Sequence, residues 1–161
     1  ARVALVSQHS LSRLAEDADS SGRTPLDVLL AALETEACPP ASASKAGAKP
    51  EASASEEAVR HLARFGIDAV SADAAASSLP RELLGRLAVA EAFWPRSPHV
   101  LALDSPEAWG LGQGDLEALG PALSEYAGAV VLATEDAHLA RALGGDRWAL
   151  EEDGLLRRCG Y

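Results

Sequence analysis

Three groups of polar residues each follow a short apolar segment, and their types are suited to chemistry. The groups are residues 7–9 (Ser-Gln-His), residues 104–105 (Asp-Ser) and residues 134–136 (Thr-Glu-Asp). Carboxylates, hydroxyls and amides can hold a hard metal ion, position water or cap a helix. Because the carboxyl ends of parallel strands meet at one edge of a sheet, we expect the three groups to lie together.

The apolar segments that precede these groups are four or five residues long and do not alternate with polar residues. This pattern is typical of parallel strands that helices cover on both faces. The predicted fold class is therefore α/β, with a parallel sheet core, flanking helices and a C-terminal β-hairpin at 147–157. Residues 7–22 are predicted to form a polar loop. Helical patterns are predicted at about 24–37, 56–65, 78–94, 115–126 and 136–143.

The chain divides into three parts by composition. Residues 1–37 and 58–161 have apolar periodicity, whereas 38–57 are rich in Ala, Ser and Pro and are predicted to be a disordered insertion. The chain starts at Ala1 and contains no methionine, so we expect that it is processed or cut from a longer polypeptide. Its two cysteines, Cys38 and Cys159, are far apart, which favours a reduced intracellular protein.

Charge and residue spacing exclude several classes of function. The 161 residues carry a formal net charge of -10, which opposes binding to nucleic acid or to an anionic membrane surface. No apolar run is long enough to span a bilayer. The glycines at 110–114 do not directly follow a strand, so a dinucleotide loop is not predicted. Zinc is not predicted either, because the histidines lack ligand spacing. They are His9, His61, His99 and His138.

Five segments occur in an order that matches a known family. They are 3–9 (VALVSQH), 87–94 (LAVAEAFW), 99–104 (HVLALD), 126–133 (YAGAVVLA) and 147–154 (RWALEEDG). In that order they resemble the Q-loop strand, the signature helix, the Walker B strand, the strand before the switch loop and the closing hairpin. The chain thus resembles the C-terminal half of an ATP-binding cassette (ABC) domain, of the soluble ABC-F or elongation-factor-three type. The resemblance implies a partial P-loop NTPase-like fold.

The resemblance also assigns roles to individual positions. Gln8 and Asp104 retain the types that the family uses beside Mg-ATP, and Asp104 would hold Mg²⁺ through water. Ser105 stands where the family has a glutamate that polarises the attacking water, and Glu135 stands where it has the switch histidine. Residues 79–83 (LPREL) replace the signature Leu-Ser-Gly-Gly-Gln. No G-x-x-x-x-G-K-[ST] sequence occurs, and by family order it would precede Ala1.

These departures predict a degenerate ABC-type domain fragment that does not hydrolyse ATP. It would act as a scaffold or as the non-catalytic partner of a competent cassette, in the cytoplasm, with no catalytic residues of its own. We expect no bound cofactor for the isolated chain, and no contact with nucleic acid or membrane.

Two alternatives stay open. The chain could bind Mg-ATP at a slow or structural site once a Walker A segment is supplied upstream, or it could be an α/β interaction module unrelated to ATP. Simpler roles also compete for single residues: Asp104 could cap a turn, Gln8 could be a solvent-exposed loop residue, and the pair Glu135-Asp136 could cap the next helix.

Overall fold

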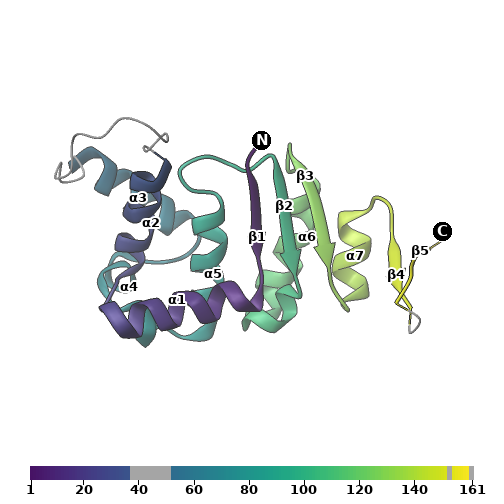
Figure 1. The fold of residues 1–161 in the computed structure, drawn as a ribbon, viewed down its shortest axis with the longest axis horizontal. Helices are drawn as coiled ribbons and strands as arrows, with labels where there is room; N and C mark the ends of the chain where they lie inside the picture. Colours follow the sequence, from purple (N-terminus) through teal and green to yellow (C-terminus); the bar gives the residue numbers. More distant parts are fainter. Residues whose placement is uncertain (37–51, 152–153, 160–161) are drawn as a thin grey trace.

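Three parallel strands and seven α-helices make up most of the part of the chain that the computed structural model describes, residues 1–36, 52–151 and 154–159. The sheet and its helices lie beside a lobe of helices, and a hairpin lies at the opposite end (Figure 1). The elements in chain order are β1 (Val3–Val6), α1 (Gln8–Ser21), α2 (Pro25–Glu36), α3 (Ala52–Arg64), α4 (Ala69–Asp73), the 3₁₀ turn η1 (Ala76–Ser78), α5 (Arg81–Ala92), β2 (Val100–Asp104), the 3₁₀ turn η2 (Pro106–Trp109), α6 (Gln113–Ser124), β3 (Ala129–Ala133), α7 (Ala137–Leu143), β4 (Trp148–Leu150) and β5 (Leu156–Arg158).

The sheet confirms the predicted fold class. The strand order is β1-β2-β3 and both pairings are parallel. Val6 is in register with Leu103, and Leu103 is in register with Leu132, so the carboxyl ends of the strands are level. The C-terminal hairpin is also confirmed, because β4 and β5 pair antiparallel.

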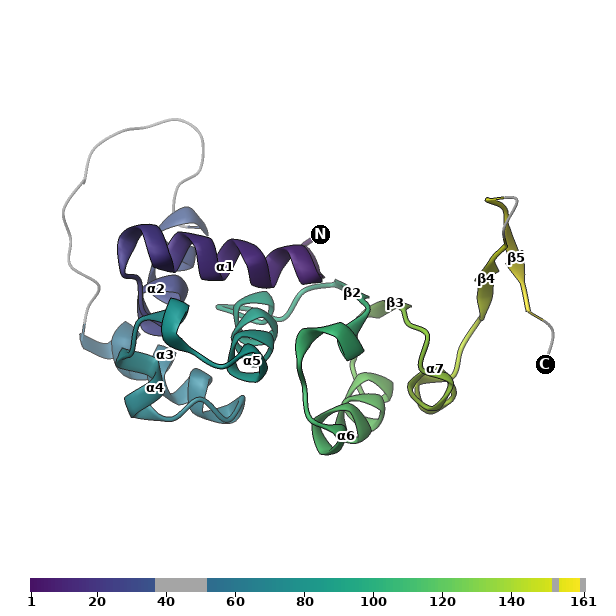
Figure 2. The same cartoon turned by 90° about the horizontal axis from the view of Figure 1, so that it is seen from below.

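Only one face of the sheet is covered within the described residues, so the predicted coverage of both faces is wrong for this part of the chain. Figure 2 shows α5, α6 and α7 on the same side of the strands. The other side exposes Val3, Leu5 and Val131, at 65%, 62% and 60% of their surface. The cause is topological: both crossovers step in the same direction, from β1 to β2 to β3, and right-handed crossovers then place their helices on one face. We call the uncovered side the open face.

The segment after β1 is a helix and not the predicted loop. The hydroxyl of Ser7 accepts from the Ser10 N–H, and the Ser10 hydroxyl accepts from the Ser7 N–H, which forms a capping box at the start of α1. Leu11, Leu14 and Ala18 fall on one face of this helix and are buried. The helix ends at Gly22, which has the left-handed conformation that glycine adopts without strain.

Helices α2, α3, α5, α6 and α7 match the predicted helical segments with shifted ends, whereas α4 lies where no helix is predicted. Thr24 and Asp27 cap the start of α2: the Asp27 carboxylate accepts from the Thr24 N–H at 3.0 Å. Helix α3 begins at Ala52 instead of residue 56, so residues 52–57 of the predicted insertion are helical, and residues 37–51 lie outside the described part. Of the helices described, none is long and apolar enough to cross a membrane.

Candidate functional site

The carboxyl edge of the sheet is the place where the sequence predicts chemistry, and the parallel register brings the three polar groups to it. Val6, Leu103 and Leu132 lie side by side near the ends of their strands, and one of the three polar groups begins within two residues of each. Gln8 is the first residue of α1 and is exposed, as is the carboxylate of Asp104. Glu135 follows β3 and is exposed as well. The predicted residues therefore share one edge, as their order in the chain implied.

Asp104 ends β2 on the open face. It is in register with Ala133, and strand alternation places it on the same side as the partly exposed Ala102. Its Oδ1 accepts from the hydroxyl of Ser105 at 3.3 Å. No side chain caps η2, whose N-cap residue is Ser105, so Asp104 does not act as the cap that the simpler interpretation proposed.

Ser105 is held in an unusual backbone conformation. Its φ of 52° lies in the left-handed region, which a non-glycine residue enters at a cost of about 1 kcal/mol or more. Its N–H donates to the carbonyl of Ala133 at 2.8 Å, which ties the end of β2 to the end of β3. The turn that follows directs Glu107 toward the segment after β3.

Glu107 is the glutamate closest in sequence to Asp104, and both of its carboxylate oxygens are already engaged. Oε2 accepts from the hydroxyl of Thr134 at 3.0 Å, and Oε1 accepts from the N–H of Glu135 at 3.0 Å. These bonds are charge-assisted and hold the carboxylate against the segment after β3. Glu107 therefore connects two loops of the edge, and it would have to break both bonds to act as a general base.

Two side chains that the sequence analysis did not single out position this loop. Trp109 is completely buried, and its Nε1–H donates to the carbonyl of Asp104 at 3.0 Å. The guanidinium of Arg81 donates to the carbonyl of Ala108 at 2.9 and 3.2 Å, so the start of α5 is fixed against η2. A tryptophan soon after an apolar strand was the available signal for the first of these contacts.

The segment after β3 confirms the helix-capping interpretation for one residue of its acidic pair. The Asp136 carboxylate accepts from the N–H groups of His138 and Leu139, at 2.7 and 3.2 Å, and so caps α7. Among the described residues, the recorded hydrogen bond of Glu135 is that of its N–H, which donates to the Glu107 carboxylate. The Glu135 side chain is thus not needed for the start of the helix.

Curated proteins with similar sequences belong to two related groups. Elongation factor 3 of Zygosaccharomyces rouxii is 34% identical over 110 residues, which cover 66% of this chain and 10% of that protein. ATP-binding cassette sub-family F member 3 of Pongo abelii is 34% identical over 103 residues, which cover 63% of this chain and 14% of that protein. The chain thus spans a small part of these relatives. No family model matches it.

Solved structures with a similar fold are cassettes. A dimeric ATP-binding cassette in a post-hydrolysis state, bound to ADP and Pi, matches 88% of this chain with a TM-score of 0.60 and 19% identity, and 55% of that cassette is covered. A dimeric bacterial ABC transporter cassette matches 74% of the chain with a TM-score of 0.54 and 21% identity. This chain is part of an ATP-binding cassette of the ABC-F and elongation-factor-3 type. About half of a solved cassette has no counterpart in it.

In this cassette segment, residues 79–83, which the sequence resemblance matches to the signature sequence, lead into helix α5. Pro80 is the N-cap residue and offers no side-chain cap, and Glu82 lies in the first turn. The Glu82 carboxylate accepts from Arg86 at 2.7 Å, and Arg86 also pairs with Asp115 of α6 at 2.9 Å. The charged residues at this helix start therefore hold α5 to its neighbour within the segment.

The residues of the edge suit a metal ion better than a phosphate. Mg²⁺ keeps several waters and needs one or two carboxylates, which the exposed Asp104 can offer. A triphosphate would instead meet the carboxylates of Glu107 and Glu135, and each pair of like charges costs about 1–4 kcal/mol at 4 Å, depending on the dielectric. Within the described ranges, no three His, Cys, Asp or Glu side chains are grouped to hold a metal.

His61 packs its ring against Trp94 at a centroid distance of 5.0 Å, and its Nε2 lies 2.9 Å from the carbonyl oxygen of Ala90. This ring has a packing role in the helical lobe.

Proposed function

We propose that this cassette segment does not hydrolyse ATP and serves as the structural, non-catalytic part of a cassette assembly. The proposal rests on the two polar residues that follow Asp104 in the chain, Ser105 and Glu107. The position where the family has its catalytic glutamate holds Ser105, and the carboxylate of Glu107 is bonded to Thr134 and Glu135. A serine hydroxyl does not accept a proton from water at neutral pH, and the Glu107 carboxylate is already bonded, so neither residue provides a free general base directly after Asp104.

The open face supports a second part of the proposal, that the remainder of a cassette covers this sheet. An apolar face formed by Val3, Leu5 and Val131 is exposed, and β3 pairs with β2 alone within the described residues. A solved cassette that matches 88% of this chain has about 45% of its own length outside the match. We propose that such a remainder, from the same polypeptide, lies on the open face beside Asp104.

The domain organisation and partners follow from this proposal. Residues 1–37 would provide the Q-loop strand and the start of the helical arm, and 58–161 the signature helix and the Walker B half. Because the matching solved cassettes are described as dimers, we propose another cassette as the partner. The excess of acidic residues argues against direct contact of this part with RNA, and the proposed location is the cytoplasm.

Binding of Mg-ATP at a slow or structural site is the second candidate, and the exposed Asp104, at the same sheet edge as Gln8, favours it. The two candidates differ in what Asp104 does once the remainder of the cassette is present. In a polypeptide that contains the complete cassette, we expect Asp104→Ala to leave the stoichiometry and the affinity for N-methylanthraniloyl-ATP unchanged within about twofold, with or without Mg²⁺. Equilibrium fluorescence titration measures both.

The matched control is Asp19→Ala, which removes an exposed carboxylate from α1 and should behave like the wild type. The contrary result is that the Asp104 variant, but not the Asp19 control, binds one Mg²⁺-dependent nucleotide fewer per cassette. That result would favour the ATP-binding candidate over the scaffold proposal.

A further inference from the structure

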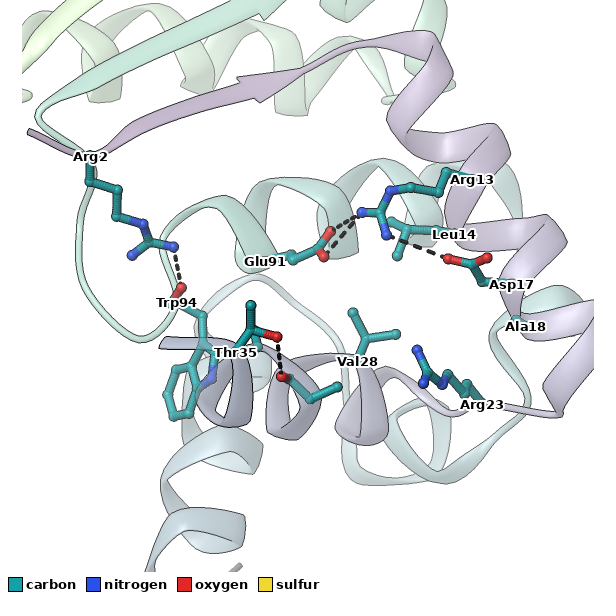
Figure 3. A pocket seen from close by; sticks show the side chains of 12 residues that line it. Arg2, Arg13, Leu14, Asp17, Ala18, Arg23, Val28, Thr35, Glu91 and Trp94 are labelled. Carbon is teal, nitrogen blue, oxygen red and sulfur yellow. Dashed lines mark hydrogen bonds and ion pairs between the residues drawn. The ribbon is translucent and has the colours of Figure 1, made fainter. Parts of the chain in front are cut away.

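A cavity of about 380 Å³ lies in the helical lobe, between α1, α2 and the end of α5 (Figure 3). None of the predicted site residues lines it. Its volume falls within the range of pockets that enclose small organic molecules. The lobe therefore contains a space of suitable size for a ligand, separate from the sheet edge.

The inner wall of the cavity is formed by apolar side chains that belong to the packed core of the lobe. Leu14 and Ala18 of α1, Val28 of α2 and Trp94 after α5 line it, and all four are buried. The Nε1–H of Trp94 donates to the carbonyl of Leu29 at 2.8 Å, so the polar atom of the indole is satisfied outside the cavity. The wall thus offers hydrocarbon and aromatic surface to a ligand.

Most charge at the rim is neutralised. The guanidinium of Arg13 donates to both oxygens of Glu91, at 3.0 and 2.8 Å, and lies 3.5 Å from the carboxylate of Asp17 (Figure 3). This network joins α1 to α5, and its one guanidinium and two carboxylates leave a formal charge of -1 on this part of the rim.

Arg23 is the exception at the rim. It stands in the connection between α1 and α2, where its carbonyl accepts from the Ala76 N–H at 2.9 Å and fixes the backbone. In the described part of the chain, its guanidinium has no hydrogen-bond or ion-pair partner, and Figure 3 shows this group pointing into the space between Val28 and Asp17. A guanidinium is planar and weakly hydrated, and it binds carboxylates through two parallel bonds.

We propose that this cavity binds a small organic anion, which places its apolar body against Trp94 and Val28 and its acidic group on Arg23. Arginines outnumber carboxylates by three to two among the lining residues, although the whole chain has a net charge of -10. A cation of the same shape would meet the unpaired guanidinium and bind poorly. The proposal does not depend on the function of the sheet edge.

The test uses the fluorescent anion 8-anilinonaphthalene-1-sulfonate as the probe for the 161-residue chain. We expect saturable binding that 1-naphthoate displaces and that the cation 1-naphthylmethylammonium does not. Arg23→Glu should weaken binding at least about tenfold, because a charge-assisted bond is replaced by repulsion. Arg23→Lys should retain part of the affinity. Perturbation of the Trp94 indole N–H signal in NMR spectra locates the probe.

Two controls separate this cavity from general adsorption. Arg60→Glu makes the same charge change at an exposed position on α3 and should leave the affinity unchanged. Leu5→Asp places a charge on the open face, which could also attract the probe, and should likewise leave it unchanged. Equal affinities of the wild type and Arg23→Glu, or loss of binding in Leu5→Asp alone, would overturn the proposal.

Discussion

Trp109→Ala is expected to lower the free energy of unfolding by about 3–5 kcal/mol, the usual cost of removing a large buried aromatic side chain. Trp109 is completely buried, and its indole N–H satisfies the carbonyl of Asp104 at the point where β2 leaves the sheet. The variant therefore loses apolar contacts and a hydrogen bond together. Urea denaturation followed by far-UV circular dichroism measures the effect.

Trp148→Ala is the matched control for this prediction. Trp148 lies in β4 and is 59% exposed, so its removal should change the free energy of unfolding by no more than about 0.5 kcal/mol. Trp109→Phe, which keeps most of the ring volume but loses the donor, should fall between the two. If Trp109→Ala were no more destabilising than Trp148→Ala, the loop after β2 would not be anchored as described.

The second large effect is expected at the open face. Leu5→Asp should change the unfolding temperature of the isolated chain by no more than about 2 °C, because Leu5 is 62% exposed there. In a polypeptide that contains the complete cassette, the same variant should lower the unfolding temperature by at least about 5 °C, because a covered and unpaired carboxylate costs several kcal/mol. Differential scanning calorimetry of both proteins gives the comparison.

Val70→Asp controls for the introduction of a charge. Val70 lies on α4, away from the sheet, and is 81% exposed, so it should have little effect in either protein. The same small shift for Leu5→Asp in both proteins would show that nothing covers the open face.

The strands and their shared edge could be predicted from sequence because they depend on short-range patterns. Runs such as Val3–Val6 are apolar throughout, which indicates strands of a parallel sheet, and the direction of parallel strands then places Gln8 and Asp104 at one edge. The coverage of the sheet could not be predicted in this way. It depends on the order of the strands in space, which the apolar pattern of each strand does not contain.

Helix α1 is a segment whose sequence pattern was wrongly interpreted as a loop. Its many Ser and Asp residues favoured a loop, although Leu11, Leu14 and Ala18 have helical spacing. Its capping box uses Ser10 instead of the Glu or Gln that usually marks a helix start in sequence. Burial of the apolar face against the lobe outweighs the weak helical propensity of the polar residues.

The arrangement around Glu107 lay beyond sequence reasoning for a different reason. The sequence shows that this glutamate is two residues away from the expected catalytic position, but not where its carboxylate points. That direction depends on the left-handed Ser105 and on the contact with Thr134, which is 27 residues away in the chain. A tertiary contact therefore decides whether the group is free for chemistry.

Phosphate release tests the central claim, that this sheet edge does not turn over ATP, most directly. The measurement compares a polypeptide that contains the complete cassette with its Asp104→Asn variant, at saturating Mg-ATP. We expect equal rates of phosphate release from the two proteins, because only another cassette in the polypeptide would hydrolyse ATP. A decrease of about a hundredfold in the variant, as expected when a catalytic metal or charge contact is lost, would contradict it.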